Sequence, residues 1–142
     1  MEVYDIPGEF AFATSMQAPA EIRHVRIINK PILPFIAGTQ ALPVPTSLQE
    51  LASITLQNNI EVHSITVICD SSALSNGVKY FIQFGNYFIG NPNSLISAII
   101  PTKYDFDFSH YPVLYNGQSI IIYGVASATG SYLQLIVNGE II

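Results

Sequence analysis

The stretch that decides the fold is residues 116–142 at the C-terminal end, NGQSIIIYGVASATGSYLQLIVNGEII. It predicts two β-strands, residues 119–126 and 131–142, joined by a short turn at Thr129 and Gly130. Apolar and polar side chains alternate along the second strand, as a sheet with one buried face requires. The apolar positions are Leu133, Leu135 and Val137, and the opposite positions are Tyr132, Gln134 and Asn138.

The first of these two strands is apolar on both faces, because the run from Ile120 to Tyr123 contains no polar side chain but the tyrosine hydroxyl. A strand of this kind is typical of the centre of a sheet, where both faces are covered. We therefore expect it to lie centrally or beneath a neighbouring subunit.

Upstream of this pair, short runs of β-branched and aromatic residues recur, separated by turn residues about every 8 to 12 positions. The turn dipeptide Asn76-Gly77 lies between two of them. Residues 78–89 form either one long strand or a bulged pair, because Gly85-Asn86 within them marks a bulge or a tight reversal. The predicted strands are residues 21–29, 53–57, 60–70, 78–89, 94–100 and 103–109. The sequence thus predicts an all-β protein. We expect a single antiparallel, jelly-roll-like β-sandwich of about eight strands over residues 21–142, with an extended N-terminal arm over residues 1–20.

The alternation within these runs also predicts which side chains share a face. In residues 60–70, one face carries His63, Ile65, Val67 and Cys69, and the other carries Val62, Ser64, Thr66 and Ile68. In residues 103–109, the residues expected to point inward are Tyr104, Phe106 and Phe108. The proline-rich residues 30–46 predict an irregular connection or a sheet edge, held to the body by Phe35 and Ile36.

The composition favours a subunit of an assembly. Charged residues make up only 11% of the 142 residues, and hydrophobic residues make up 49%, whereas an average globular protein is about 25% charged. Interface cores are depleted of charge, and a freely diffusing enzyme usually carries more charge to stay soluble. The alternative is a soluble domain of low charge.

Charge and hydropathy also restrict the partners. The net charge is −5, and the chain has only five basic residues. The nearest approach to a basic cluster is the group Arg23, His24, Arg26 and Lys30. The solvated face of a strand explains this group better than a site for phosphate groups does. We expect no direct contact with nucleic acid. No apolar run approaches the roughly 18 residues of a membrane span, and the start of the chain lacks the pattern of a signal peptide. We expect synthesis in a host cytoplasm.

The N-terminal arm carries Phe10, Phe12 and Met16 among Pro7, Gly8 and Pro19, without strand or helix periodicity. Burying three such side chains contributes about 1.5–3 kcal/mol each, whereas ordering each backbone residue costs about 1–2 kcal/mol. Side chains alone therefore cannot hold the arm in place. We predict that it binds a neighbouring subunit by adding a strand to its sheet.

Residues that could carry chemistry lack the spacing of catalytic or metal-binding motifs. His24, His63 and His110 are far apart in the sequence and form no ligand motif. Asp105 and Asp107 could share a Ca²⁺ ion, but such an ion needs six or more oxygen ligands and the neighbouring residues supply few. Solvated charges on an aromatic strand explain the two aspartates better. Neither a nucleophile elbow nor a glycine-rich phosphate loop is present. We predict no enzyme activity, no catalytic or metal-binding residue and no cofactor.

Aromatic residues concentrate between residues 80 and 115. A core together with a subunit interface explains them, because tyrosine is enriched at interfaces. The alternative is a carbohydrate- or receptor-binding module, in which rings stack on sugars and amides bond their hydroxyl groups. For that alternative, the candidate glycan contacts are Tyr87, Asn91, Tyr104 and Tyr111.

Two segments resemble the late strands of small β-sandwich proteins from virus and phage particles. They are HSITVICDSSALSNGVKYFIQFGNYFIG (residues 63–90) and PVLYNGQSIIIYGVASATGSYLQLIVNGEII (residues 112–142). In those families a step of proline, hydrophobe and glycine precedes a long strand, here from Pro112 to Ser119, and a glycine, here Gly139, lies near the end of the closing strand. The resemblance covers residues 61–142 and not the first sixty.

The resemblance implies a jelly-roll or related sandwich that serves as a capsid, decoration or spike subunit. Together with the composition, it predicts a non-enzymatic structural protein of the virion that self-associates through apolar strand faces and the N-terminal arm. The expected partners are copies of this chain and other virion proteins, and a host glycan under the alternative.

Overall fold

The computed structural model describes residues 33–142. The predicted arm with Phe10, Phe12 and Met16, the boundary between residues 20 and 21, and the predicted strand at 21–29 lie outside these residues. The elements are β1 (Leu33–Gly38), β2 (Leu42–Pro43), β3 (Gln49–Thr55), β4 (Ile60–Cys69), β5 (Lys79–Phe84), β6 (Tyr87–Ile89), β7 (Ile96–Ser97), β8 (Thr102–Asp105), the 3-10 turn η1 (Phe108–His110), β9 (Val113–Leu114), β10 (Ser119–Val125) and β11 (Tyr132–Ile141).

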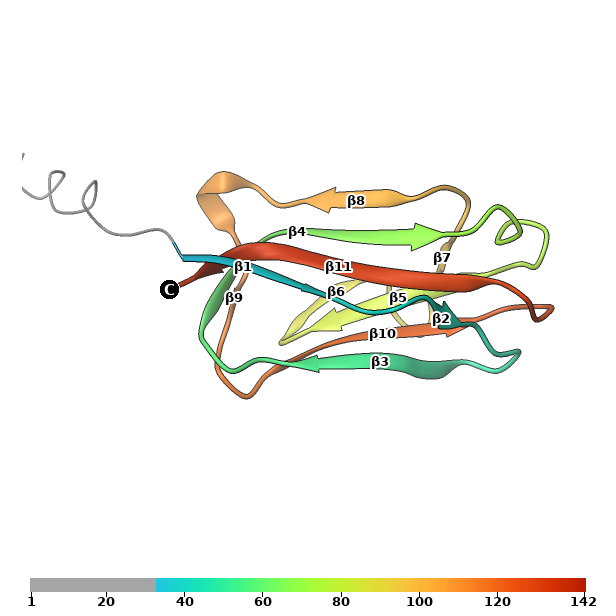
Figure 1. The fold of residues 1–142 in the computed structure, drawn as a ribbon, viewed down its shortest axis with the longest axis horizontal. Helices are drawn as coiled ribbons and strands as arrows, with labels where there is room; N and C mark the ends of the chain where they lie inside the picture. Colours follow the sequence, from blue (N-terminus) through green and yellow to red (C-terminus); the bar gives the residue numbers. More distant parts are fainter. Residues whose placement is uncertain (1–32) are drawn as a thin grey trace, which may run out of the picture. The chain divides into compact units, whose positions relative to one another are not determined.

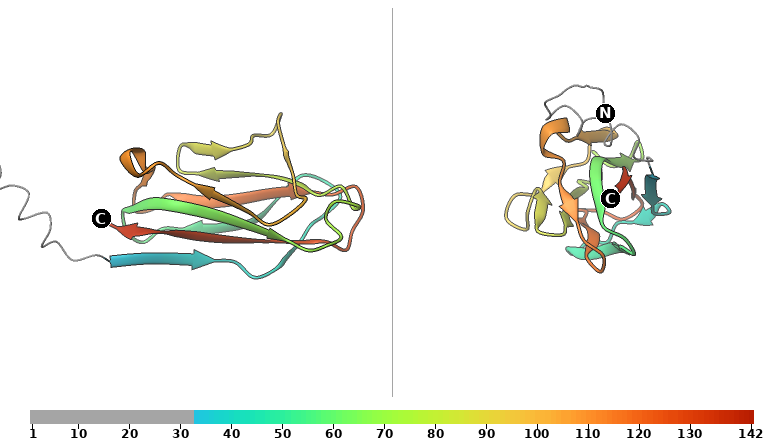
Figure 2. Two further views of the ribbon diagram at one scale, coloured as in Figure 1. Left: turned by 90° about the horizontal axis from the view of Figure 1, so that it is seen from above. Right: turned by 90° about the vertical axis from the view of Figure 1, so that its left-hand side faces the viewer.

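These strands form two antiparallel sheets that face each other (Figures 1 and 2). Sheet A has the order β1-β11-β4-β8, with β2 beside β11 and β9 beside β4. Sheet B has the order β3-β10-β5-β6, with β7 beside β5. The predicted β-sandwich is confirmed. The apolar strand β10 lies in the interior of sheet B, between β3 and β5, which is one of the two positions expected for it.

The connectivity is that of a jelly roll. Strands from the first half of the described chain pair in reverse order with strands from the second half: β1 with β11, β3 with β10, β4 with β8, and β5 with β6. The described chain is therefore one long antiparallel ribbon wrapped so that its pairs alternate between the two sheets. One of the eight predicted strands, residues 21–29, lies outside the described residues, and the predicted strand 78–89 is divided into β5 and β6. The strands β2, β7 and β9 are two-residue additions.

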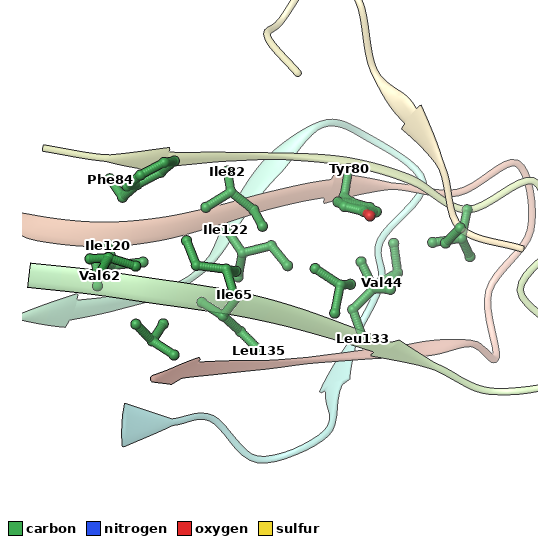
Figure 3. Close-up of a cluster of buried hydrophobic side chains, with 14 of the residues drawn as sticks. Val44, Val62, Ile65, Tyr80, Ile82, Phe84, Ile120, Ile122, Leu133 and Leu135 are labelled. Carbon is green, nitrogen blue, oxygen red and sulfur yellow. The ribbon is translucent and has the colours of Figure 1, made fainter. Parts of the chain in front are cut away.

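The core lies between the sheets (Figure 3). Ile82 and Ile122 of sheet B point toward Ile65 and Leu135 of sheet A, and all four side chains are fully buried. Each such side chain contributes about 1.5–3 kcal/mol when it leaves water. The alternation predicted for the last strand is confirmed, because Leu133, Leu135 and Val137 are all in this core.

The edge predicted from the prolines is β1, whose one pairing among residues 33–142 is with β11. Pro34 has no N–H to donate and is accommodated at this edge. Phe35 packs against the core as expected. The expectation for Ile36 was wrong, since 73% of this residue is exposed. Consecutive strand residues point to opposite faces, so Phe35 and Ile36 cannot both face inward.

A β-bulge changes the faces predicted for β4. Asn138 of β11 pairs with Ser64, and the next residue, Gly139, pairs with Val62, so His63 is an extra residue without a partner in β11. Such an insertion reverses the alternation at that point. Val62 therefore joins Ile65 and Val67 in the core. His63 lies on the outer face instead of the inner face that the sequence pattern predicted.

The inward position predicted for Phe108 was also wrong. The strand β8 ends at Asp105, and the carboxylate of Asp107 then accepts a hydrogen bond from the backbone N–H of Ser109 at 3.1 Å. This capping contact begins η1 and turns the chain away from the sheet. Phe108 is 84% exposed as a result, whereas Tyr104 and Phe106 pack against the core as predicted.

A hydrogen bond between the hydroxyl groups of Tyr80 in sheet B and Tyr104 in sheet A joins the two sheets, with 2.6 Å between the oxygen atoms. Burial raises the pKa of Tyr80 well above its ordinary value, and the Tyr104 hydroxyl raises it further. The folded state thus favours the neutral phenol, whereas an unfolded tyrosine ionises near pH 10. The stability that this group contributes is complete below about pH 10 and declines as the pH rises above it.

We therefore expect the free energy of unfolding to fall above about pH 10, and Tyr80→Phe to remove part of that fall. At neutral pH this variant loses about 1 kcal/mol, because the Tyr104 hydroxyl loses its buried partner. Urea unfolding at pH 8 and pH 11 measures both effects, with the exposed Tyr115→Phe as control. Equal alkaline losses in the two variants would contradict this role for Tyr80.

Candidate functional site

The outer face of sheet B carries a row of apolar residues along β10 although it points away from the core, and polar residues of β3 and β5 flank this row. Along β10, Ile121, Tyr123 and Val125 point outward, because the intervening residues are buried. Phe81 on β5 is the strand partner of Tyr123, and Phe88 on β6 continues the surface with 52% exposure. We call these five residues, Phe81, Phe88, Ile121, Tyr123 and Val125, the sheet B face.

An aromatic stack forms the middle of the sheet B face. The rings of Phe81 and Tyr123 are nearly parallel, with centroids 4.4 Å apart and an interplanar angle of 7°. Phe81 is only 4% exposed, yet it does not belong to the cluster of buried side chains between the sheets. The sheet B face is therefore a second apolar layer, packed on the side of the sheet opposite the core.

The outer face of sheet A is more polar at the equivalent positions. The outward residues of its interior strand β11 are Tyr132, Gln134, Ile136, Asn138 and Glu140. The outward residues of β10 in sheet B are Ser119, Ile121, Tyr123 and Val125. Both strands lie in the interior of their sheets, so strand position does not explain this difference. The difference in polarity indicates that sheet B is the side suited to contact another protein.

A second feature is a group of metal-ligating side chains on the outer face of sheet A. Glu61 and His63 of β4 and Glu140 of β11 bring one ligand atom each within 4.8 Å of one another. The Nε2 atom of His63 is 3.0 Å from a carboxylate oxygen of Glu61. All three side chains are partly exposed. We call this group the Glu–His–Glu cluster; carboxylate oxygens with an imidazole nitrogen can hold a metal ion.

Sequence reasoning missed this cluster. Glu61 and His63 are two residues apart on a predicted strand, which is a signal that they share a face. Glu140 joins them through the pairing of β4 with β11, in which Glu61 and Glu140 are direct partners. The bulge at His63 depends on the same pairing. Neither the pairing of Glu61 with Glu140 nor the bulge at His63 could be predicted from spacing along the chain.

The structure does not gather the four predicted glycan contacts into one site. Tyr111 stacks on His63, with ring centroids 4.1 Å apart, and so lies beside the Glu–His–Glu cluster. Tyr87 belongs to sheet B and stacks on the buried ring of Phe84. The hydroxyl group of Tyr104 is bound to Tyr80, and the side-chain oxygen of Asn91 accepts a hydrogen bond from the backbone N–H of Asn93 in its own turn.

The two aspartates considered for Ca²⁺ have protein partners. Asp105 forms an exposed ion pair with Lys103, at 3.5 Å. Asp107 accepts hydrogen bonds from the backbone N–H and the hydroxyl group of Ser109, both at 3.1 Å. Their roles in the described chain are an ion pair and a turn cap.

A groove of about 500 Å³ opens where β2 and the start of β3 lie near the turn between β10 and β11. The exposed ring of Tyr132 lies on it, together with Gln49, Glu50 and Thr129. An aromatic ring beside amide, carboxylate and hydroxyl groups suits a small polar ligand. The alternation of the last strand predicted an outward position for Tyr132, but no sequence pattern predicted this groove.

Comparisons with protein-family models, curated proteins and solved structures found no match to this chain. Within residues 33–142, none of the helical segments has the length and apolar character needed to cross a membrane.

Proposed function

We propose that this chain is a non-enzymatic structural subunit of a virus or phage particle, and that copies of it associate through the sheet B face. The observation that carries the proposal is the apolar layer of Phe81, Tyr123 and their neighbours outside the core. Phe81 is already buried, so the part of this layer open to a partner is Phe88 with the half-buried side chains of Ile121, Tyr123 and Val125. Apolar side chains gathered at one place on the surface are typical of contacts with another subunit. The jelly-roll connectivity and the resemblance to particle proteins support the viral setting by analogy.

A second copy of the same chain suits this surface. The chain has a net charge of −5, so two copies repel each other unless they meet where charge is absent. The charged residues that face outward beside the sheet B face are Glu50 on β3 and Lys79 on β5, on opposite sides of β10. A two-fold axis parallel to β10 brings Glu50 of one copy to the side of Lys79 of the other, two residues away along β10, because Glu50 pairs with Tyr123 and Lys79 with Val125. Such a contact is self-complementary, as a symmetric dimer requires.

The proposal is tested by the oligomeric state and by the natural location of the chain. In mass photometry of the full chain over a concentration series, we expect oligomers whose fraction rises with concentration. Mass spectrometry of particles purified from the native source should detect the chain as a stoichiometric component. A chain that stays monomeric and is missing from the particles would refute the proposed function.

Carbohydrate binding is the second candidate, and the groove at Tyr132 favours it over the four residues named from the sequence. A glycan array with the full chain separates the two functions. A glycan whose binding is lost in Tyr132→Ala and kept in Tyr87→Ala would establish a receptor-binding module. If the wild-type chain binds no glycan, the structural function is favoured.

A further inference from the structure

The Glu–His–Glu cluster places two carboxylates side by side on neighbouring interior strands. Glu61 and Glu140 are direct partners in the pairing of β4 with β11. Like charges at directly opposed positions destabilise a sheet. The two lysines of residues 33–142 lie elsewhere, since Lys103 pairs with Asp105 and Lys79 belongs to sheet B. A bound cation would therefore relieve the repulsion between the two carboxylates, and the basic residues of the described chain do not supply one.

His63 is held in position to supply a third ligand. The bulge places its side chain on the face that carries both glutamates, and its ring stacks on Tyr111 at an interplanar angle of 26°. Its Nε2 atom is directed at Glu61, at 3.0 Å. A ring fixed by stacking loses little freedom when it binds an ion, which favours binding. The side chains of His63 and Glu61 are about 30% exposed, at 31% and 29%, so an ion can reach them from solvent.

Gly139 provides the close approach on which this arrangement depends. A Cβ atom at this position would overlap the backbone carbonyl oxygen of Glu61. The glycine precedes Glu140 and lies opposite Val62, so it brings the two strands together next to all three ligands. The glycine therefore allows the backbones of β4 and β11 to lie close together at the point where the three side chains meet.

We propose that the Glu–His–Glu cluster binds a divalent transition-metal ion, for which Zn²⁺ has the fitting chemistry. Zinc is bound by imidazole nitrogen and carboxylate oxygen at about 2.0–2.2 Å, so two ligand atoms of a tetrahedral zinc ion lie about 3.3–3.6 Å apart. The ligand atoms here lie within 4.8 Å, and small rotations of the two glutamate side chains bring them to that range. Ca²⁺ is a poorer match, because it takes six or more oxygen ligands.

Three protein ligands leave a fourth position of a tetrahedral ion for water or an external group. The ion neutralises the opposed carboxylates and joins β4 to β11 at their bulge. It therefore stabilises the folded state over an unfolded chain, in which Glu140 is far from Glu61 and His63.

The test is calorimetry and thermal unfolding of the full chain with ZnCl₂, and with CaCl₂ as a comparison. We expect saturating Zn²⁺ to raise the Tm by several degrees, and Ca²⁺ to have no effect. In His63→Gln and in Glu140→Gln, the Zn²⁺ affinity should fall at least tenfold. The matched control is His110→Gln, which removes an exposed histidine of η1 and should bind Zn²⁺ like the wild type.

Glu140→Gln keeps the test decisive even if His63→Gln unfolds. It has nearly the same shape as the wild-type side chain and removes the repulsion between opposed carboxylates. Without metal it should be as stable as the wild type or more so, while it loses the response to Zn²⁺. If Glu140→Gln keeps the wild-type affinity, or if Zn²⁺ does not change the Tm of the wild type, the proposed site is wrong.

Discussion

Gly139→Ala is expected to lower the free energy of unfolding by about 3 kcal/mol, at the upper end of what overpacking costs. The new Cβ atom would overlap the carbonyl oxygen of Glu61 and lie 3.2 Å from the Cα atom of Val62. Both are backbone atoms of β4, which is held between β11 and β8, so they cannot rotate away as a side chain would. The strands must separate at their bulge, at the end of the core where Val62 is fully buried.

The control for this prediction is Gly117→Ala. A Cβ atom at Gly117 meets no atom within 4 Å, but the residue has a φ angle of 92°. Gly117→Ala should therefore lower the free energy of unfolding only by the conformational strain at this residue, about 1–2 kcal/mol. Urea unfolding followed by far-ultraviolet circular dichroism measures both variants. If Gly139→Ala costs no more than Gly117→Ala, the close approach of β11 to β4 is not tight.

The sequence was sufficient to predict the sandwich because the decisive strands are continuous in the chain. The alternation from Leu133 to Val137 has a period of two and identifies the buried face without reference to any partner. The run from Ile120 to Tyr123 has no polar face, which indicated a position with strands on both sides. Local patterns were therefore sufficient for the fold class. The dipeptide Gly85-Asn86 indicated either a bulge or a reversal, and the structure has the reversal there, between β5 and β6.

Features that depend on pairing between distant strands could not be predicted in this way. The bulge at His63 exists because β11 has one residue fewer between Asn138 and Gly139 than β4 has opposite them. The approach of Glu140 to Glu61 has the same origin. Phe108 continued an alternating pattern, but the strand ends at Asp105, and the hydrogen bond that the Asp107 carboxylate accepts from the backbone N–H of Ser109 begins a turn there. The groove at Tyr132 required knowledge of how two loops meet.

The second large effect is expected for Ile121→Lys, which should weaken self-association at least about 100-fold. Ile121 lies at the middle of β10, between Ser53 of β3 and Gln83 of β5. In a monomer the lysine side chain can extend its ammonium group into water, so the fold should be kept. In an association through the sheet B face, the charge would be buried without a partner, at a cost of about 3–5 kcal/mol.

Ile136→Lys is a closely matched control. Ile136 is the same residue type, points outward from β11, and has strand partners on both sides, Gly38 and Thr66. It differs in belonging to the outer face of sheet A. The substitution adds the same charge to the same kind of position, so any general effect of lysine on solubility or net charge is shared by the two variants.

Sedimentation velocity of the wild type, Ile121→Lys and Ile136→Lys at one concentration tests the central claim most directly. If copies of this chain associate through the sheet B face, the wild type and Ile136→Lys sediment as the same oligomer and Ile121→Lys sediments as a folded monomer. The claim is contradicted if all three sediment alike, or if Ile136→Lys is the variant that becomes monomeric.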